Sequence, residues 1–447
     1  GSAADLYDRP LVGAELCGAF DAAMDSLMLY RVTLDLFARG VNYLVPHGMW
    51  YDPAPEHVRI PPLISPYNPT LAPALKRYSD FAARSCAMLQ GGRRVADVAV
   101  LYPIAAAQAG FRFGGGDEWG ESAPPELDYQ RVGALLTTVL HRDYTLVHPE
   151  MLTDGRVRPE GRTMLLDNRV NRQRYDVLIL PGGKVFSAEA LGRVREFYER
   201  GGRVIATSCL PERSAEFGMD DALRSEVEAL FGSPSERRAG TIRRNGAGGA
   251  AVFVPEPDAR SLERAFAALE SDPDVVIADT ARHAGSGTSF GYLTKMVASE
   301  QEASASDPTG GNGASFCYIH KQKDGRDIYF FTNSSNDSIS TPVSLRGRLK
   351  LQRWDPFTGE TTGLASRRER RSGGTYTHRA FSSWASAANK ERDPPLPGFP
   401  CRRRHGESPC AGPDADDPAD GCRYGRACSG IAGGPFRISD YLTPCGT

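Results

Sequence analysis

The sequence predicts an α/β chain followed by an all-β region, and two patterns carry this prediction. Continuous runs of Val, Ile and Leu alternate with segments of helical period up to about residue 235, a pattern typical of parallel sheets with helical crossovers. Short strand candidates separated by Gly, Asn, Asp and Ser clusters then fill residues 240–365. We therefore expect four parts: residues 1–92, 93–235, 240–365 and 366–447.

Residues 1–92 read as a βαβ unit with a further helix. A short apolar run, 9–14 (RPLVGA), ends at Glu15, and helical periodicity over 22–39 stops at Gly40. A second buried-looking strand follows at 41–46 (VNYLVP). Since a crossover helix between two such strands makes them parallel, their carboxyl ends should lie side by side.

Residues 93–235 repeat the alternation in a longer form that predicts a flavodoxin-like, doubly wound domain. The expected strands are 95–102, 144–148, 175–180 and 203–207, and the expected helices are 128–140 and 187–200.

Residues 240–365 predict a β-sandwich. Its strand candidates are 252–254, 316–320, 327–332, 342–345 and 349–354, and we interpret Trp354 to Gly359 as a simple turn. From residue 366 onward the chain is poor in aliphatic residues and rich in Arg, Pro, Cys and Gly, so we expect an irregular tail. Because the strand pattern stops so abruptly near Gly363, our hypothesis is that this tail is non-native, for example read in a wrong frame.

Composition and charge exclude several classes of partner. Lys plus Arg number 53 against 55 for Asp plus Glu, which leaves a net charge of −2 and no basic surface of the kind that nucleic acids need. The sequence has no apolar stretch long enough to span a bilayer, so we expect no membrane partner, and it has no signal-peptide pattern. The sequence does not determine the cellular compartment, and a secreted or periplasmic location is compatible with it. Because the chain starts at Gly1 without Met and inside a domain pattern, we expect a fragment whose N-terminal part is missing.

The cysteines do not predict a metal site. Five of the nine lie in the last 47 residues, but none forms a C-x-x-C pair, so neither zinc nor any other metal is indicated by the residues, and no cofactor is required.

Glu15 and His47 are the residues we expect to carry chemistry. Each stands at the carboxyl end of a predicted parallel strand, where α/β barrels and sheets place their catalytic groups. Glycoside hydrolysis uses a carboxylate as general base or nucleophile, together with a second one as acid. Trp50 and Tyr51 follow His47, and aromatic faces next to an imidazole suit sugar recognition. The structural alternative is a surface or salt-bridged glutamate and two rings that cover the strand end.

The middle domain offers a rival. Cys209 follows the strand 203–207, as a nucleophile at a strand-to-helix turn would, but Thr207 and Pro211 stand where such a turn wants glycine. No convincing His and Glu pair follows, which favours a structural role. The turn Pro181 to Lys184 before a helix could hold an anion, although it lacks the phosphate-binding motif.

Several motifs in a fixed order resemble the C-terminal half of large multidomain glycoside hydrolases. They are PLVGAE, ARGVNYLVPHGMWYD, RYSDFAARSCAMLQGGRRVADVAVLYP, YDVLILPGG, DIYFFTNSS and RWDPFTGE. Together they span residues 1–365. The nearest resemblance is to the family 106 α-L-rhamnosidases and related barrel glycosidases that carry a glutamine-amidotransferase-like domain.

The resemblance implies that residues 1–92 are the end of a partial (β/α)8 barrel, with Glu15 on the seventh strand and His47 on the eighth. Glu15 would be the nucleophile or general base, and His47, Trp50 and Tyr51 would bind the carbohydrate. The acid carboxylate would come from a fourth strand that this chain lacks, so we expect the chain alone to be inactive. The family is described as calcium-dependent, although no ligand set is recognisable here.

The implied reaction is hydrolysis of an O-glycosyl bond, with an α-L-rhamnoside as candidate substrate. The alternative is a non-catalytic carbohydrate-binding or assembly module built on the flavodoxin-like domain. The oligomeric state is left open.

Overall fold

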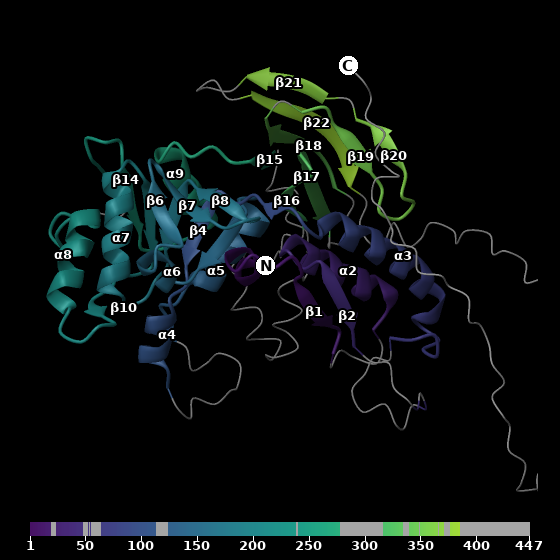
Figure 1. Ribbon diagram of the computed structural model, residues 1–447, viewed down its shortest axis with the longest axis horizontal. Coiled ribbons are helices and arrows are strands. Elements are labelled where there is room, and N and C mark those ends of the chain that lie inside the picture. Colours follow the sequence, from purple (N-terminus) through teal and green to yellow (C-terminus); the bar gives the residue numbers. More distant parts are fainter. Residues whose placement is uncertain are drawn as a thin grey trace, which may run out of the picture. The chain divides into compact units, whose positions relative to one another are not determined.

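The computed structural model describes residues 1–18, 24–47, 52, 54, 64–112, 124–237, 240–277, 316–333, 339–347, 349–364, 366–370 and 376–384 (Figure 1). All of them fall within residues 1–394, which cluster as one unit. The fold is α/β plus β, as the sequence predicts. In this part of the chain no helix is long and apolar enough to cross a membrane. Trp50, Tyr51 and residues 385–447 of the expected tail lie outside the described residues.

The N-terminal region is a parallel strand pair backed by two helices. Its elements are α1 (Ser2–Leu6), β1 (Gly13–Leu16), α2 (Ser26–Ala38), β2 (Tyr43–Pro46) and α3 (Ala72–Leu89). Asp25 caps α2, because its carboxylate accepts a hydrogen bond of 2.8 Å from the Met28 amide. Glu15 lies inside β1 rather than after it, since the strand starts later than the apolar run suggests. Two strands do not make a barrel, so the described residues show only the βαβ unit.

A six-stranded sheet forms the centre of the chain. Its order is β13-β14-β11-β9-β4-β5, and five of these strands are parallel. Counted along the chain, the parallel strands follow the order 2-1-3-4-5, which is that of flavodoxin-like sheets. The strands are β4 (Val98–Leu101), β5 (Tyr144–Val147), β9 (Val177–Leu180), β11 (Arg203–Thr207), β14 (Ala250–Val254) and the antiparallel β13 (Ile242–Arg244).

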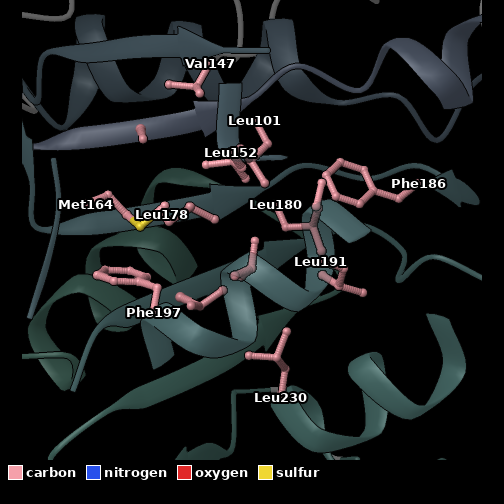
Figure 2. Close-up of a cluster of buried hydrophobic side chains, with 14 of the residues drawn as sticks. Leu101, Val147, Leu152, Met164, Leu178, Leu180, Phe186, Leu191, Phe197 and Leu230 are labelled. Atoms are coloured by element: carbon pink, nitrogen blue, oxygen red, sulfur yellow. The ribbon is translucent and has the colours of Figure 1, made fainter. Parts of the chain in front are cut away.

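Helices cover this sheet on both faces, because successive residues of each buried strand point to opposite sides. Leu178 and Leu180 enter one apolar cluster and Val177 and Ile179 the other. Figure 2 shows the first cluster, in which Leu178 and Leu180 meet side chains of the covering helices such as Leu191. The helices are α4 (Ile104–Gly110), α5 (Tyr129–Ala134) continued by the π-helical turn η2 (Leu135–Val139), α6 (Glu150–Thr153), α7 (Ala188–Glu199), α8 (Asp220–Phe231) and α9 (Ala259–Ala268).

Two small sheets accompany the large one. An antiparallel sheet of β6 (Val157–Glu160), β7 (Thr163–Asp167) and β8 (Arg172–Tyr175) is inserted between β5 and β9 and was not predicted. The short strands β10 (Val185–Phe186) and β12 (Arg213–Ser214) pair in parallel next to α7.

The C-terminal region has two antiparallel sheets with one apolar cluster between them. The first is β15-β18-β22-β21 and the second β17-β16-β3, and the cluster takes Val275 and Val343 from one and Phe316 from the other. The strands are β3 (Arg93–Arg94), β15 (Val275–Ile277), β16 (Phe316–Lys323), β17 (Arg326–Asn333), β18 (Ile339–Arg346), β21 (Ser366–Arg370) and β22 (Tyr376–Trp384), with a hairpin of β19 (Gln352–Trp354) and β20 (Thr361–Gly363).

Two predicted boundaries are wrong. The run at 252–254 belongs to β14, the fifth parallel strand of the doubly wound sheet, because α9 follows it and returns to pack on that sheet. The part of the chain from 366 is not irregular throughout, since β22 pairs with β18 from Ile339 to Arg346. Its residues YTHRAFSSW include the aromatic and Thr side chains that strands favour.

The predicted turn around Asp355 also does more than reverse the chain. Phe357 from this turn stacks on Phe81 of α3 with ring centroids 4.6 Å apart, and Arg84 donates to the Phe357 carbonyl at 2.8 Å. The β19–β20 hairpin therefore ties the C-terminal region to the helices behind β1 and β2.

Candidate functional site

Glu15 and His47 lie next to each other at the carboxyl ends of β1 and β2. The strands pair with Glu15 opposite Val45, and the His47 amide donates to the Leu16 carbonyl at 2.9 Å. This places His47 Nε2 3.9 Å from Glu15 Oε1. That separation is too long for a direct hydrogen bond, but it leaves both groups able to contact one small molecule. The Glu15 side chain is 65% exposed and that of His47 19%.

Asn42 fixes the register that brings the pair together. Its buried side chain accepts a hydrogen bond of 2.8 Å from the Val12 amide and donates one of 3.1 Å to the Pro10 carbonyl. Gln90, just after α3, donates to the Asn42 carbonyl at 2.9 Å. One side chain thus links the starts of both strands, and a slip by one residue would leave its donors and acceptor unpaired. Sequence reasoning missed Asn42, although a polar residue inside an apolar strand start was a usable signal.

The turn after β1 shapes the space beside the imidazole. Cys17 adopts a left-handed backbone with φ of 65°, and burial raises the pKa of its thiol to about 12, so it stays protonated at neutral pH. At Gly18 a Cβ atom would lie 3.5 Å from the His47 ring. The His47 ring therefore rests against the backbone of this turn.

The face of the strand pair that carries Glu15 has exposed side chains, and no described helix or strand packs on it. Leu11, Tyr43 and Val45 are 53%, 51% and 46% exposed on it. The opposite face is packed, with Leu16 buried and Leu44 against the α2 and α3 core. Parallel sheets are ordinarily covered on both faces, so this face has the composition of a surface built to be covered.

The rival position at Cys209 does not form a nucleophile site. The left-handed residue after β11 is Ser208, with φ of 52°, and its hydroxyl donates to Asp128 at 2.6 Å. Burial raises the pKa of the Cys209 thiol, and the carboxylates of Glu126, Asp128 and Glu212 raise it further, against one backbone hydrogen bond from Gly183 that lowers it. A thiol held protonated in this way is a poor nucleophile.

The turn from Pro181 to Lys184 has no room for an anion. The Gly182 amide already donates to Asp128 at 2.7 Å, and a Cβ atom at Gly182 would lie 2.4 Å from the Glu126 carbonyl. This crevice is where doubly wound sheets usually bind ligands, and here residues 126–128 fill it.

No group of three or more His, Cys, Asp or Glu side chains in the described ranges is arranged to hold a metal ion. The calcium ion that the resemblance implies therefore finds no fitting ligand set among these residues.

No protein-family model matches the sequence, and no curated protein matches it. Solved structures do. The rhamnosidase from Novosphingobium sp. PP1Y superposes with a TM-score of 0.55 at 20% identity, over 85% of this chain and 31% of that one. A β-galactosidase from Bacillus circulans sp. alkalophilus gives a TM-score of 0.47 at 11% identity, over 85% of this chain and 57% of that one. A catalytic mutant of a GH42 β-galactosidase from G. stearothermophilus gives a TM-score of 0.49 at 12% identity, over 82% of this chain and 52% of that one.

The rhamnosidase match shows that this chain shares its fold with part of that rhamnosidase. The chain spans 31% of the rhamnosidase and 57% and 52% of the two β-galactosidases.

Proposed function

We propose that this chain is part of a glycosidase and that Glu15 is one of its two catalytic carboxylates. The observation that carries the proposal is the pairing of Glu15 with His47, 3.9 Å apart, at the carboxyl ends of adjacent parallel strands. In parallel α/β barrels this end holds the active site. The fold shared with the rhamnosidase supports the same class of reaction.

In this proposal β1 and β2 are the last two strands of a barrel. The uncovered face with Leu11, Tyr43 and Val45 would then be the barrel interior, where side chains from the other strands pack against it. This accounts for a parallel pair that is apolar on its exposed side.

Glu15 would act as general base or nucleophile, and His47 would hydrogen-bond a sugar hydroxyl next to it. Trp50 and Tyr51 would add stacking surface. The acid carboxylate would come from another barrel strand, because glycosidases need two carboxyl groups flanking the scissile bond. The separation of that pair would decide the stereochemistry. An α-L-rhamnoside is the candidate substrate, by resemblance and by the name of the matching rhamnosidase.

The alternative is an assembly module in which the doubly wound domain provides packing surface. The contacts at Gly182 favour such a role for that domain, because Asp128 and the Glu126 carbonyl already occupy the space beside this glycine. The two roles are compatible when the domain supports a barrel from the side.

The test is a Glu15→Gln variant in the complete open reading frame that contains this chain, assayed on an aryl α-L-rhamnoside. We expect kcat to fall by about 10³-fold or more with an unchanged melting temperature, because only the charge at the reacting centre is lost. The matched control is Glu263→Gln on the exposed side of α9, which should leave kcat unchanged. Near-normal turnover of Glu15→Gln would remove the catalytic assignment.

A further inference from the structure

A buried charged network lies in the C-terminal region, separate from the candidate site. His320 on β16 has a side chain only 4% exposed, and each ring nitrogen faces a carboxylate. Nδ1 lies 2.8 Å from Asp274 Oδ2, and Nε2 lies 3.0 Å from Asp327 Oδ1. Both contacts have hydrogen-bond length.

This geometry favours a protonated ring. An ionised carboxylate only accepts hydrogen bonds, whereas a neutral imidazole has one donor and one acceptor nitrogen. A neutral His320 would therefore turn a lone pair toward one of the two carboxylates. The imidazolium donates to both Asp274 and Asp327, so the network fits the charged ring.

The network continues into the doubly wound domain through Arg346 on β18. Arg346 Nη2 lies 3.2 Å from Asp274 Oδ1, and both of its terminal nitrogens lie 2.9 Å from the Asp97 carboxylate just before β4. Carboxylates and cations thus alternate from Asp97 through Arg346 and Asp274 to His320. The chain of contacts links the large sheet to both sheets of the C-terminal region.

Tyrosines from two strands face the same groups. The Tyr329 ring on β17 stacks on His320 with centroids 3.9 Å apart, and its hydroxyl donates to the Arg346 carbonyl at 3.4 Å. Tyr318 on β16 lies near Asp274, and burial raises the pKa of both phenols well above the ordinary value. Both tyrosines therefore stay neutral across the pH range in which a histidine titrates.

Asp176 and Arg142 are charged groups near Asp97 at the other end of the network. A charged neighbour closer to Asp327 is Arg93 on β3. It donates to the Gln322 side chain, whose amide in turn donates to Asp327 at 2.8 Å. Burial raises the pKa of Asp97, although its ion pair with Arg346 opposes this. The hydrogen bond from His320 lowers the pKa of Asp327. Of the groups in this network, His320 is the one whose hydrogen bonds to two carboxylates depend on its holding a proton on both ring nitrogens.

Burial alone would lower the pKa of His320, but its hydrogen bonds to Asp274 and Asp327 outweigh burial and raise it. A raised pKa means that the folded state binds this proton more tightly than the unfolded state. The stabilisation is complete below the unfolded pKa of about 6.5 and is lost as pH rises through the folded pKa.

We propose that protonated His320 is a pH-sensitive latch that holds the two C-terminal sheets together and, through Arg346, to the doubly wound domain. When the ring loses its proton, one of its two carboxylate contacts turns repulsive, and the β15 to β18 region loosens. The structure thereby couples the attachment of the C-terminal region to the protonation of His320.

The test compares the wild-type chain with His320→Asn by thermal unfolding from pH 5 to pH 9. We expect the wild-type melting temperature to fall by about 2–4 °C more than that of the variant as pH rises through the folded pKa, because only the wild type loses this proton. The matched control is His148→Asn, a partly exposed histidine beside Glu150, which should keep the wild-type pH dependence. Identical pH dependence of wild type and His320→Asn would overturn the proposal.

A second variant keeps the test decisive where His320→Asn does not fold. Asp327 is 29% exposed, so Asp327→Asn removes one carboxylate without opening the core. The ring ¹⁵N shifts of His320 report its titration directly. We expect a wild-type pKa above 6.5 and a decrease of about one unit in Asp327→Asn. A His320 ring that is neutral at pH 6, or that titrates identically in both proteins, would contradict the latch. Hydrogen-exchange protection factors of β16 and β18, which correct for the intrinsic rise of exchange with pH, should fall over the same pH interval in the wild type.

Discussion

Two parallel sheets in this chain differ in how completely they are covered. Every residue of β9 is buried, with helices on both faces of its sheet, whereas in β1 and β2 only Leu16 is buried and Ala14 and Leu44 are half-buried. Both arise from the same βαβ pattern in the sequence. The difference teaches that the six-stranded sheet has an apolar cluster on each face. Glu15 of the candidate site, in contrast, lies on the exposed face of the strand pair.

The largest expected effect compares matched apolar truncations in the two sheets. Ile179→Ala on β9 removes a fully buried side chain and should lower the free energy of unfolding by about 2–5 kcal/mol. Val45→Ala on β2 should change it by less than about 0.5 kcal/mol, because Val45 is 46% exposed. Chemical denaturation of both variants measures this. Equal losses of unfolding free energy would mean that the face of β1 and β2 that carries Glu15 is covered after all.

A smaller effect is expected at Asn42, and it should stay local. Asn42→Ala leaves the Val12 amide and the Pro10 carbonyl without this partner, which should cost about 1–3 kcal/mol and speed amide exchange in β1 and β2. The matched control is Asn245→Ala, whose side chain bridges Tyr198 and Gly249 in the same way within the doubly wound domain. In Asn245→Ala, amide exchange should become faster near β14 only. Faster amide exchange in β1 of this control would refute a local role for Asn42.

The smallest effect concerns a carboxylate that caps the N-terminus of α7, one of the helices that cover the six-stranded sheet. Glu216 accepts hydrogen bonds from the Ser187 hydroxyl and the Ala188 amide at the start of α7. Burial alone would raise the pKa of Glu216, but these bonds and one from Ser214 outweigh it and lower the pKa. Stability from this group is therefore present above its ordinary pKa and lost as pH falls through the folded value.

Glu216→Gln should accordingly lower the free energy of unfolding by about 0.5–1 kcal/mol at pH 7 and by less at pH 3. Denaturation at the two pH values measures the difference. Glu189→Gln, an exposed glutamate in the same helical turn, is the control. A deficit that persists unchanged at pH 3 would show that the charge of Glu216 has no part in it.

Much of the fold could be predicted because buried parallel strands are written as unbroken aliphatic runs. Segments such as 177–180 and 203–207 stand out for this reason. The insertion β6 to β8 escaped, since Arg172 and Arg174 alternate with buried residues and do not resemble a core strand. The run at 252–254 was assigned to the wrong sheet, because a short strand does not reveal its partner until the helix after it is placed.

The candidate site was predictable in part for a similar reason. The βαβ spacing alone puts Glu15 beside His47, and the structure brings them together. The sequence did not reveal two tertiary contacts. One is the hydrogen bonding of the Asn42 side-chain amide, and the other is the stacking of Phe357, in a predicted turn, on Phe81. The catalytic role of Glu15 and the sugar contacts of His47, Trp50 and Tyr51 stay predictions.

The uncovered strand pair also bears on how the isolated chain behaves in concentrated solution. Within the described residues, β1 and β2 pair only with each other, so each has one edge without a strand partner. On β2 the Leu44 backbone hydrogen-bonds the Cys86 thiol instead. Tyr43 and Val45 stand beside these edges. Open edges next to apolar side chains are templates for strand addition between molecules. This corner is therefore where aggregation of the purified chain would start, and where a solubilising charge is best placed.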